Sequence, residues 1–173
     1  SEMFDCPICL ESVSISHRIT LDCNHRFCKI CIGNTIRSAI GNVSDEIPVK
    51  CPLFHSGCTT IITENLPEID TIINTSDKEK LEKFTILKQH IPQERLRYCP
   101  NNNCQMPYEY VGEIITTPPT NTTNILNTLI CSNCNTNICT FCNTFNHPNL
   151  SCEYMSRQNN RENFQNQEYI EKY

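Results

Sequence analysis

The sequence contains no tryptophan, and its apolar content is low once cysteine is set aside. Apolar residues make up 38% of the 173 residues, but 14 residues are cysteines, which leaves about 30% for an ordinary core. Small modules with so little apolar material usually need disulfides or bound metal in order to fold. The composition therefore excludes one large hydrophobic core and favours two or three small modules, each held together by disulfides or bound metal.

Targeting and membrane segments are also absent from the sequence. The chain opens SEMFDCPICL, without the basic and apolar regions of a secretory signal. No apolar run approaches the 18 residues of a transmembrane helix, so we expect no membrane partner. We expect a cytoplasmic or nuclear location, because reducing compartments keep thiols free. The alternative is a secreted scaffold in which the cysteines form disulfides.

Clustered positive charge is scarce as well. The chain has 14 Lys and Arg against 19 Asp and Glu, a formal net charge of −5. Its one modest basic stretch, residues 78–97, lies on a predicted helix and is balanced by Glu79, Glu82 and Glu94. Because a phosphate-binding surface needs clustered basic residues, we expect no nucleic-acid partner.

The cysteines come in short-spaced pairs, which is the pattern of metal sites. Four pairs have the spacing C-x2-C: Cys6 with Cys9, Cys28 with Cys31, Cys131 with Cys134, and Cys139 with Cys142. Cys99 and Cys104 are spaced C-x4-C. Two histidines have similar short spacings, His25 in C-x-H with Cys23 and His147 in H-x4-C with Cys152. Fourteen cysteines and two histidines supply ligands for four tetrahedral zinc ions with none left over, whereas disulfides would leave both histidines unexplained. His17 and His90 are expected to be surface or cap residues, and His55 is an alternative to Cys51 or Cys58.

The first eight ligands read C-x2-C-x13-C-x-H-x2-C-x2-C-x19-C-x6-C. This order resembles the RING finger, in which alternate pairs bind alternate ions. The resemblance implies one zinc on Cys6, Cys9, Cys28 and Cys31, and a second on Cys23, His25, Cys51 and Cys58. The final C-x6-C is longer than usual in that family, so the loop CPLFHSGC is expected to bulge.

The next eight ligands read C-x4-C-x26-C-x2-C-x4-C-x2-C-x4-H-x4-C, a spacing similar to the in-between-RING (IBR) domain. There the pairs are used in sequence. The implied sets are Cys99, Cys104, Cys131 and Cys134, then Cys139, Cys142, His147 and Cys152. A RING followed by this domain resembles the RING-between-RING (ariadne/parkin-like) ubiquitin ligases over residues 4–155.

The expected fold is a series of small zinc-stapled α+β modules with little regular structure. We expect a cross-brace RING finger at 1–65, a connecting helical linker at 66–96, a sequential two-zinc IBR domain at 97–153, and a linker at 154–173 leading to an absent catalytic module. The Thr-, Asn- and Pro-rich stretch 112–129 is expected to be a mobile loop. Short strands are expected at 18–23 and 47–50.

Two helices are predicted within this scheme. Ile32, Ile36 and Ile40 define an apolar stripe on residues 28–41, closed by Gly41. In the second helix, residues 76–92, Ser76 and Glu79 predict a capping box, and Pro92 ends it. Its apolar stripe is Leu81, Phe84, Leu87 and Ile91. This helix is either a plain connector or, as the resemblance implies, an element that orients the modules and helps to bind ubiquitin.

The ligand count bears on function, because a zinc ion with four protein ligands has no open position for water. The zinc ions are therefore expected to be structural. The resemblance implies a ubiquitin-conjugating enzyme as partner, contacted by Ile8 in CPIC and by Pro52 and Leu53 in CPLF. Internal packing of Ile8 is the alternative. The helix position where many RING fingers carry an aromatic is Thr35, which predicts a weak contact.

The resemblance also implies an E3 ubiquitin-protein transferase that passes ubiquitin through its own cysteine to a substrate protein. Ordinary RING ligases carry a cation just after the last zinc ligand, but this chain has Thr59 and Thr60 there. Every cysteine is assigned to zinc, so the catalytic cysteine is expected in a further module. The alternative is a non-catalytic adaptor or decoy that binds conjugating enzymes or ubiquitin.

Overall fold

The computed structural model describes residues 2–112 and 128–160. The chain divides into two compact units between Leu96 and Arg97. Both units consist of short strands and few helices around clusters of cysteine and histidine, which confirms the predicted fold class. The division into four parts stays a prediction.

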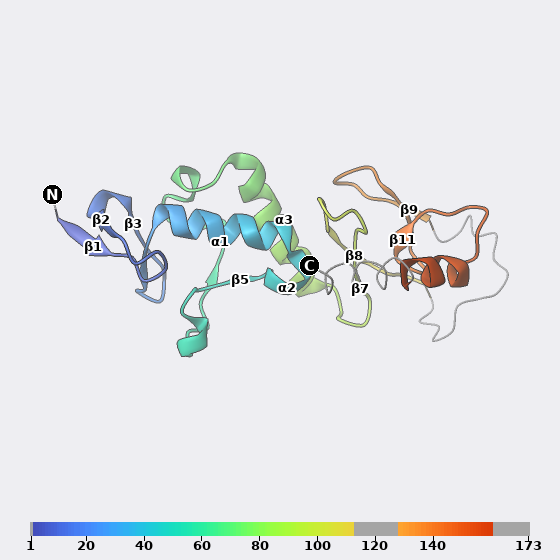
Figure 1. Ribbon diagram of the computed structural model, residues 1–173, viewed down its shortest axis with the longest axis horizontal. Coiled ribbons are helices and arrows are strands. Elements are labelled where there is room, and N and C mark those ends of the chain that lie inside the picture. Colours follow the sequence, from blue (N-terminus) through green and yellow to red (C-terminus); the bar gives the residue numbers. More distant parts are fainter. Residues whose placement is uncertain (1, 113–127, 161–173) are drawn as a thin grey trace, which may run out of the picture. The chain divides into compact units, whose positions relative to one another are not determined.

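The first unit is organised around one central helix. Its helices are α1 (Lys29–Gly41), α2 (Val43–Glu46) and α3 (Thr75–His90), and its strands are β1 (Met3–Asp5), β2 (Ser12–Ser14), β3 (Arg18–Thr20), β4 (Arg26–Cys28), β5 (Val49–Lys50) and β6 (Ile61–Ile62). The strands form antiparallel pairs, β1 with β2, β3 with β4, and β5 with β6. In this unit the strands β1 to β3 lie at the beginning of α1, and α2 and α3 lie toward its end (Figure 1).

The buried stripe of α1 differs in one position from the prediction. Ile32 and Ile36 are fully buried, but the next buried residue is Ala39, and Ile40 is only half-buried. Residues seven apart are about 20° from alignment on a helix, whereas residues eight apart are about 80° away. Ala39 therefore lies closer to the line of Ile32 than Ile40 does.

Helix α3 starts before the position that we predicted. The N-cap is Asn74, whose side-chain oxygen accepts a hydrogen bond of 2.8 Å from the N–H of Asp77. The predicted capping box at Ser76 is wrong because Asn74 already satisfies the exposed N–H of this turn. Leu81 and Phe84 are fully buried, as an apolar stripe requires, and the helix ends at His90.

The second unit has β7 (Leu96–Tyr98) at its start and contains β8 (Pro107–Glu109), β9 (Thr128–Ile130), β10 (Asn137–Cys139) and β11 (Thr144–Phe145). Strand β7 pairs with β8, and β10 lies between β9 and β11. Residues 152–160 are helical. Most of the predicted mobile loop and the last part of the predicted linker lie outside the described residues. Among the described residues, none of the helices has the length and apolarity needed to cross a membrane.

Candidate metal centres and docking surface

Three of the cysteine turns share one backbone geometry. The residue after the second cysteine is Leu10, Gln105 or Asn135, and each has a positive φ, of 61°, 52° and 58° respectively. Each of these residues donates its N–H to the carbonyl four positions earlier, at 2.8 to 3.0 Å. The chain thus bends back sharply after each pair, which lets both thiols approach one point.

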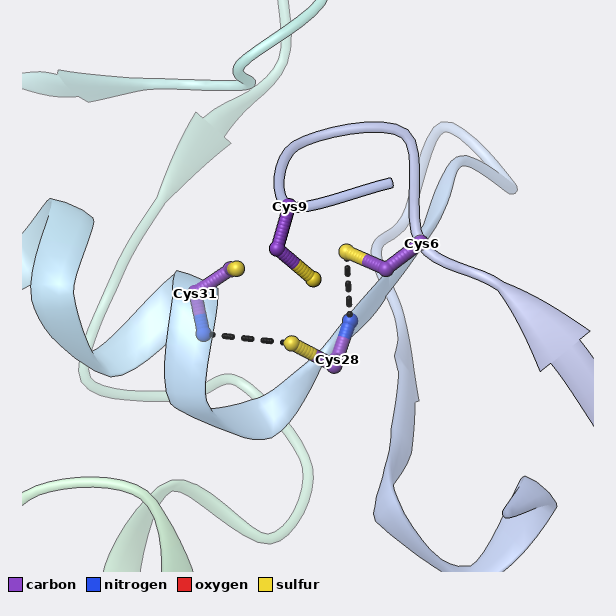
Figure 2. A group of neighbouring side chains, drawn as sticks. All are labelled: Cys6, Cys9, Cys28 and Cys31. Atoms are coloured by element: carbon purple, nitrogen blue, oxygen red, sulfur yellow. Dashed lines mark hydrogen bonds between the residues drawn. The ribbon is translucent and has the colours of Figure 1, made fainter. Parts of the chain in front are cut away.

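The first group contains Cys6, Cys9, Cys28 and Cys31, whose sulfur atoms lie within 4.8 Å of one another. Figure 2 shows the four sulfurs facing a common centre. Cys6 and Cys9 come from the turn after β1, and Cys31 lies in the first turn of α1. Cys28 is the N-cap of α1, and its Sγ accepts a hydrogen bond of 3.4 Å from the N–H of Cys31. The N–H of Cys28 in turn donates to Sγ of Cys6 at 3.3 Å.

The second group contains Cys23, His25, Cys51 and Cys58. The sulfurs of Cys23 and Cys51 are 3.8 Å apart, and Nδ1 of His25 lies 3.4 Å from Sγ of Cys51. The loop between Cys51 and Cys58 contains a short 3-10 helix, Phe54–Ser56, followed by Gly57 with φ 91°. The loop therefore bulges, as its length predicts. The segment CNHRFCKIC thus serves both groups, because Cys28 and Cys31 belong to the first and Cys23 and His25 to the second.

The third group contains Cys99, Cys104, Cys131 and Cys134. Cys99 and Cys134 have their sulfurs 3.7 Å apart, as do Cys104 and Cys131. The side-chain amide of Asn133 donates to Sγ of Cys104 at 3.2 Å. All four ligands therefore converge although 26 residues separate the two pairs in the sequence.

The fourth group contains Cys139, Cys142, His147 and Cys152. The sulfurs of Cys139 and Cys152 are 3.8 Å apart, and Nε2 of His147 lies 3.1 Å from Sγ of Cys142. Nδ1 of His147 is 2.8 Å from the carbonyl oxygen of Leu150. A proton on Nδ1 would donate to that oxygen and leave the lone pair of Nε2 directed at the group, as is usual for a metal-bound histidine.

The sulfur–sulfur distances fit a tetrahedral ion and exclude disulfides. With zinc–sulfur bonds of about 2.3 Å, two sulfurs of a regular tetrahedron lie about 3.8 Å apart. The four sulfur pairs given above are separated by 3.7 to 3.8 Å. A disulfide would bring the two sulfurs to about 2.0 Å, and none of the fourteen cysteines forms one. The members of each group are those that the resemblance implied, and their binding of zinc stays a prediction.

The protein alone stabilises few of the thiolates that such an ion requires. Burial opposes the ionisation of Cys6, but N–H donors from Cys28, Cys9 and Ile8 lower its pKa to about 6. The N–H of Thr60 lowers the pKa of Cys58 to about 6. Burial instead raises the pKa of Cys51 and of Cys152 to about 12. A divalent cation would stabilise the remaining thiolates, which otherwise repel one another at this separation.

Two threonines that support the groups were missed in the sequence. Thr136 Oγ1 lies 3.1 Å from Sγ of Cys134, and Thr144 Oγ1 lies 3.0 Å from Sγ of Cys142. Burial raises the pKa of Cys134, but hydrogen bonds from Thr136 outweigh it and lower the value to about 6. The signal that could have found them is the tripeptide CNT, which occurs at both places.

The proposed docking residues lie on the two metal-binding loops of the first unit. Ile8 is 41% exposed, so part of its side chain is available at the surface, while Pro52 and Leu53 are half-buried. Thr35 donates its hydroxyl to the carbonyl of Cys31 at 2.9 Å. His55 lies outside the four groups and packs against Phe54, with ring centroids 3.7 Å apart and the ring planes tilted by 38°.

The sequence matches two family models in the order of the two units. The model described as "Zinc finger, C3HC4 type (RING finger)" matches residues 6–53, and the "IBR domain, a half RING-finger domain" matches residues 79–152. An Arabidopsis thaliana protein named "Probable E3 ubiquitin-protein ligase ARI10" is 25% identical over 105 residues. The chain belongs to the RING-between-RING family.

Other relatives of this RING-between-RING chain differ in name and in length. A Dictyostelium discoideum protein named as an E3 ubiquitin-protein ligase is 31% identical over 109 residues. The Arabidopsis protein named "ATP-dependent RNA helicase DEAH11, chloroplastic" is 25% identical over 154 residues. The matches cover 61%, 61% and 86% of this chain, but only 20%, 11% and 8% of the ARI10, Dictyostelium and DEAH11 proteins. The chain thus spans a fifth or less of the length of these relatives.

Proposed function

We propose that this chain is the part of a ubiquitin ligase that recruits a ubiquitin-conjugating enzyme charged with ubiquitin. The observation that carries the proposal is the presence of four closed cysteine and histidine groups in RING-then-IBR order. The relatives named as E3 ubiquitin-protein ligases support the same activity. The full protein would transfer ubiquitin to a substrate protein in a reducing compartment.

Each group would bind one zinc ion, four in all, through the sixteen cysteines and histidines described above. Four protein ligands complete a tetrahedron, so the role of each ion would be structural. The zinc would neutralise the thiolates and fix the loops that carry Ile8, Pro52 and Leu53. An apolar side chain held at the surface by metal-bound loops is a suitable contact for a protein partner.

The ubiquitin thioester would pass to a cysteine outside these groups. All fourteen cysteines of the sequence lie within the groups, so none is free as a nucleophile. In the transfer, a thiolate would attack the thioester carbonyl and form a new carbon–sulfur bond, while the thiolate of the conjugating enzyme leaves. Thr59 and Thr60 provide no cation after the last RING ligand, so direct transfer to lysine is not expected.

A discharge assay tests this proposal. The zinc-loaded chain is expected to bind a charged conjugating enzyme without accelerating the loss of ubiquitin to free lysine. The variant Ile8→Ala is expected to lose roughly tenfold or more in binding affinity while its zinc content stays unchanged. Fast discharge to lysine, or full binding by the Ile8→Ala variant, would contradict the proposal.

The engagement of every cysteine also favours a second candidate, a non-catalytic adaptor that binds conjugating enzymes or ubiquitin. Reading the gene beyond Tyr173 separates the two candidates. A further series of zinc ligands with one unpaired cysteine supports the transferase, whereas a stop codon supports the adaptor.

A further inference from the structure

The cysteine turn of the fourth group lacks a backbone hydrogen bond that closes the three turns described above. Asn143 follows Cys142 and has a positive φ of 54°, like its counterparts in those turns. In the described part of the chain, however, the N–H of Asn143 makes no hydrogen bond to the carbonyl of Cys139, four positions earlier. The shape of this turn therefore depends more on contacts made by side chains.

A buried tyrosine provides such a contact. Tyr108 lies on β8, and its hydroxyl donates a hydrogen bond of 2.6 Å to Oδ1 of Asn143. Only 9% of Tyr108 is exposed, so water competes little for this bond. The bond thus holds the side chain of Asn143, and with it the turn next to Cys142, against β8.

The ring of Tyr108 belongs to the core of the third group. It forms one buried cluster with Cys99, Cys104, Cys131 and Ile138. The three cysteines of this cluster are ligands of the third group. The residues that gather around the third metal site therefore also set the position of the tyrosine hydroxyl.

Strand β10 makes a second link between the two groups. Ile138 is fully buried in the same cluster, and the next residue, Cys139, is a ligand of the fourth group. Because successive residues of a strand point to opposite faces, β10 presents one side chain to each group. The backbone makes this link, whereas the link through Tyr108 depends on one oxygen atom that a substitution can remove.

We propose that Tyr108 couples the two metal groups of the second unit, so that metal in either group raises the affinity of the other. Tyr108 is a positioning residue, because its ring is fixed among the ligands of the third group and its hydroxyl orders the turn of Cys142. With the third group loaded, less conformational entropy would be lost when the fourth group binds its ion. Thermodynamic linkage requires the same factor in the opposite direction. This inference rests on the proposed function, because it assumes that both groups bind zinc.

Stepwise removal of zinc from the full zinc-loaded chain with a competing chelator tests this proposal. NMR signals of the His147 ring report on the fourth group, and the amide signal of Cys131 reports on the third. In the wild type both signals should change together, over the same narrow range of chelator concentration. In Tyr108→Phe, which removes one oxygen atom and keeps the ring, both affinities should fall by the same factor, roughly tenfold.

Two further variants and a control assign this effect to the hydrogen bond. Asn143→Gly removes the acceptor and permits the positive φ, so it should reproduce the loss. The double variant Tyr108→Phe/Asn143→Gly should be no weaker than Asn143→Gly, since both changes break the same bond. The matched control Tyr98→Phe removes a hydroxyl from β7, the strand that pairs with β8, and should leave zinc release unchanged.

The outcomes separate this inference from the proposed function. Weaker binding by the fourth group alone in Tyr108→Phe would mean that the tyrosine supports only the turn of Cys142, which overturns the coupling. Unchanged release in that variant, or an equal loss in Tyr98→Phe, would overturn it too. In each of these cases the zinc sites of the proposed function stand. Absence of zinc from both groups in the wild type would contradict the proposed function itself.

Discussion

At the position that follows a metal-binding pair, this chain uses asparagine in two turns and leucine in another. Asn135 and Asn143 have φ angles of 58° and 54°, which asparagine tolerates well. Leu10 has a φ of 61° although leucine disfavours this region, and its side chain is 82% exposed. Burial of the side chain therefore offsets little of the backbone strain.

Replacing this leucine is expected to stabilise the first unit. Leu10→Asn should raise the free energy of unfolding by about 0.5–1 kcal/mol, because the backbone conformation stays the same and the strain falls. Urea unfolding of the zinc-loaded chain measures the change. Leu10→Ala keeps the backbone strain but removes the exposed apolar group, so an equal gain in that variant would refute the backbone explanation.

In the turns that carry the third and fourth groups, each CNT tripeptide has an asparagine in the left-handed backbone conformation. The threonine that follows places its hydroxyl close to the sulfur of the cysteine. We expect Thr136→Val to weaken metal binding by the third group roughly tenfold, since outer hydrogen bonds usually contribute this much. The variant should also raise the pKa of Cys134, because a hydroxyl donor near its thiolate is lost. Competition with a chelator measures the affinity, and Thr128→Val on β9 is the control. Equal affinity in the two variants would refute the role of Thr136.

The sequence predicted the metal-ligand groups but missed several features of the helices around them. The sixteen ligands were identifiable because tetrahedral metal sites constrain the spacing of cysteines in a turn. The cap at Asn74 and the burial of Ala39 were missed, since each depends on how a helix begins and rotates against its neighbours. The hydrogen bond from Tyr108 to Asn143 was missed as well, because the two residues are 35 positions apart in the sequence.

At the scale of the whole molecule, each unit contains two complete groups and shares no ligand with the other. Cys51→Ser should therefore reduce bound zinc in the first unit and leave both ions of the second in place. Metal analysis and amide hydrogen exchange measure this, and Cys139→Ser provides the reciprocal variant. Loss of all four ions from either variant would mean that the units do not fold separately.

The order of the ligands along the chain also determines which segments of each unit stay joined after the backbone is cut. In the first unit the groups interleave, so a nick at residues 11–22 leaves Cys6 and Cys9 tethered through metal to Cys28 and Cys31. In the second unit the groups follow one another, and a nick at residues 135–138 passes between two complete sets. Only non-covalent contacts, such as the 2.6 Å hydrogen bond from Tyr108 to Asn143, would then join the pieces. Bound metal would therefore hold the first unit together after such a cut, whereas a single cut can separate the second unit into two pieces.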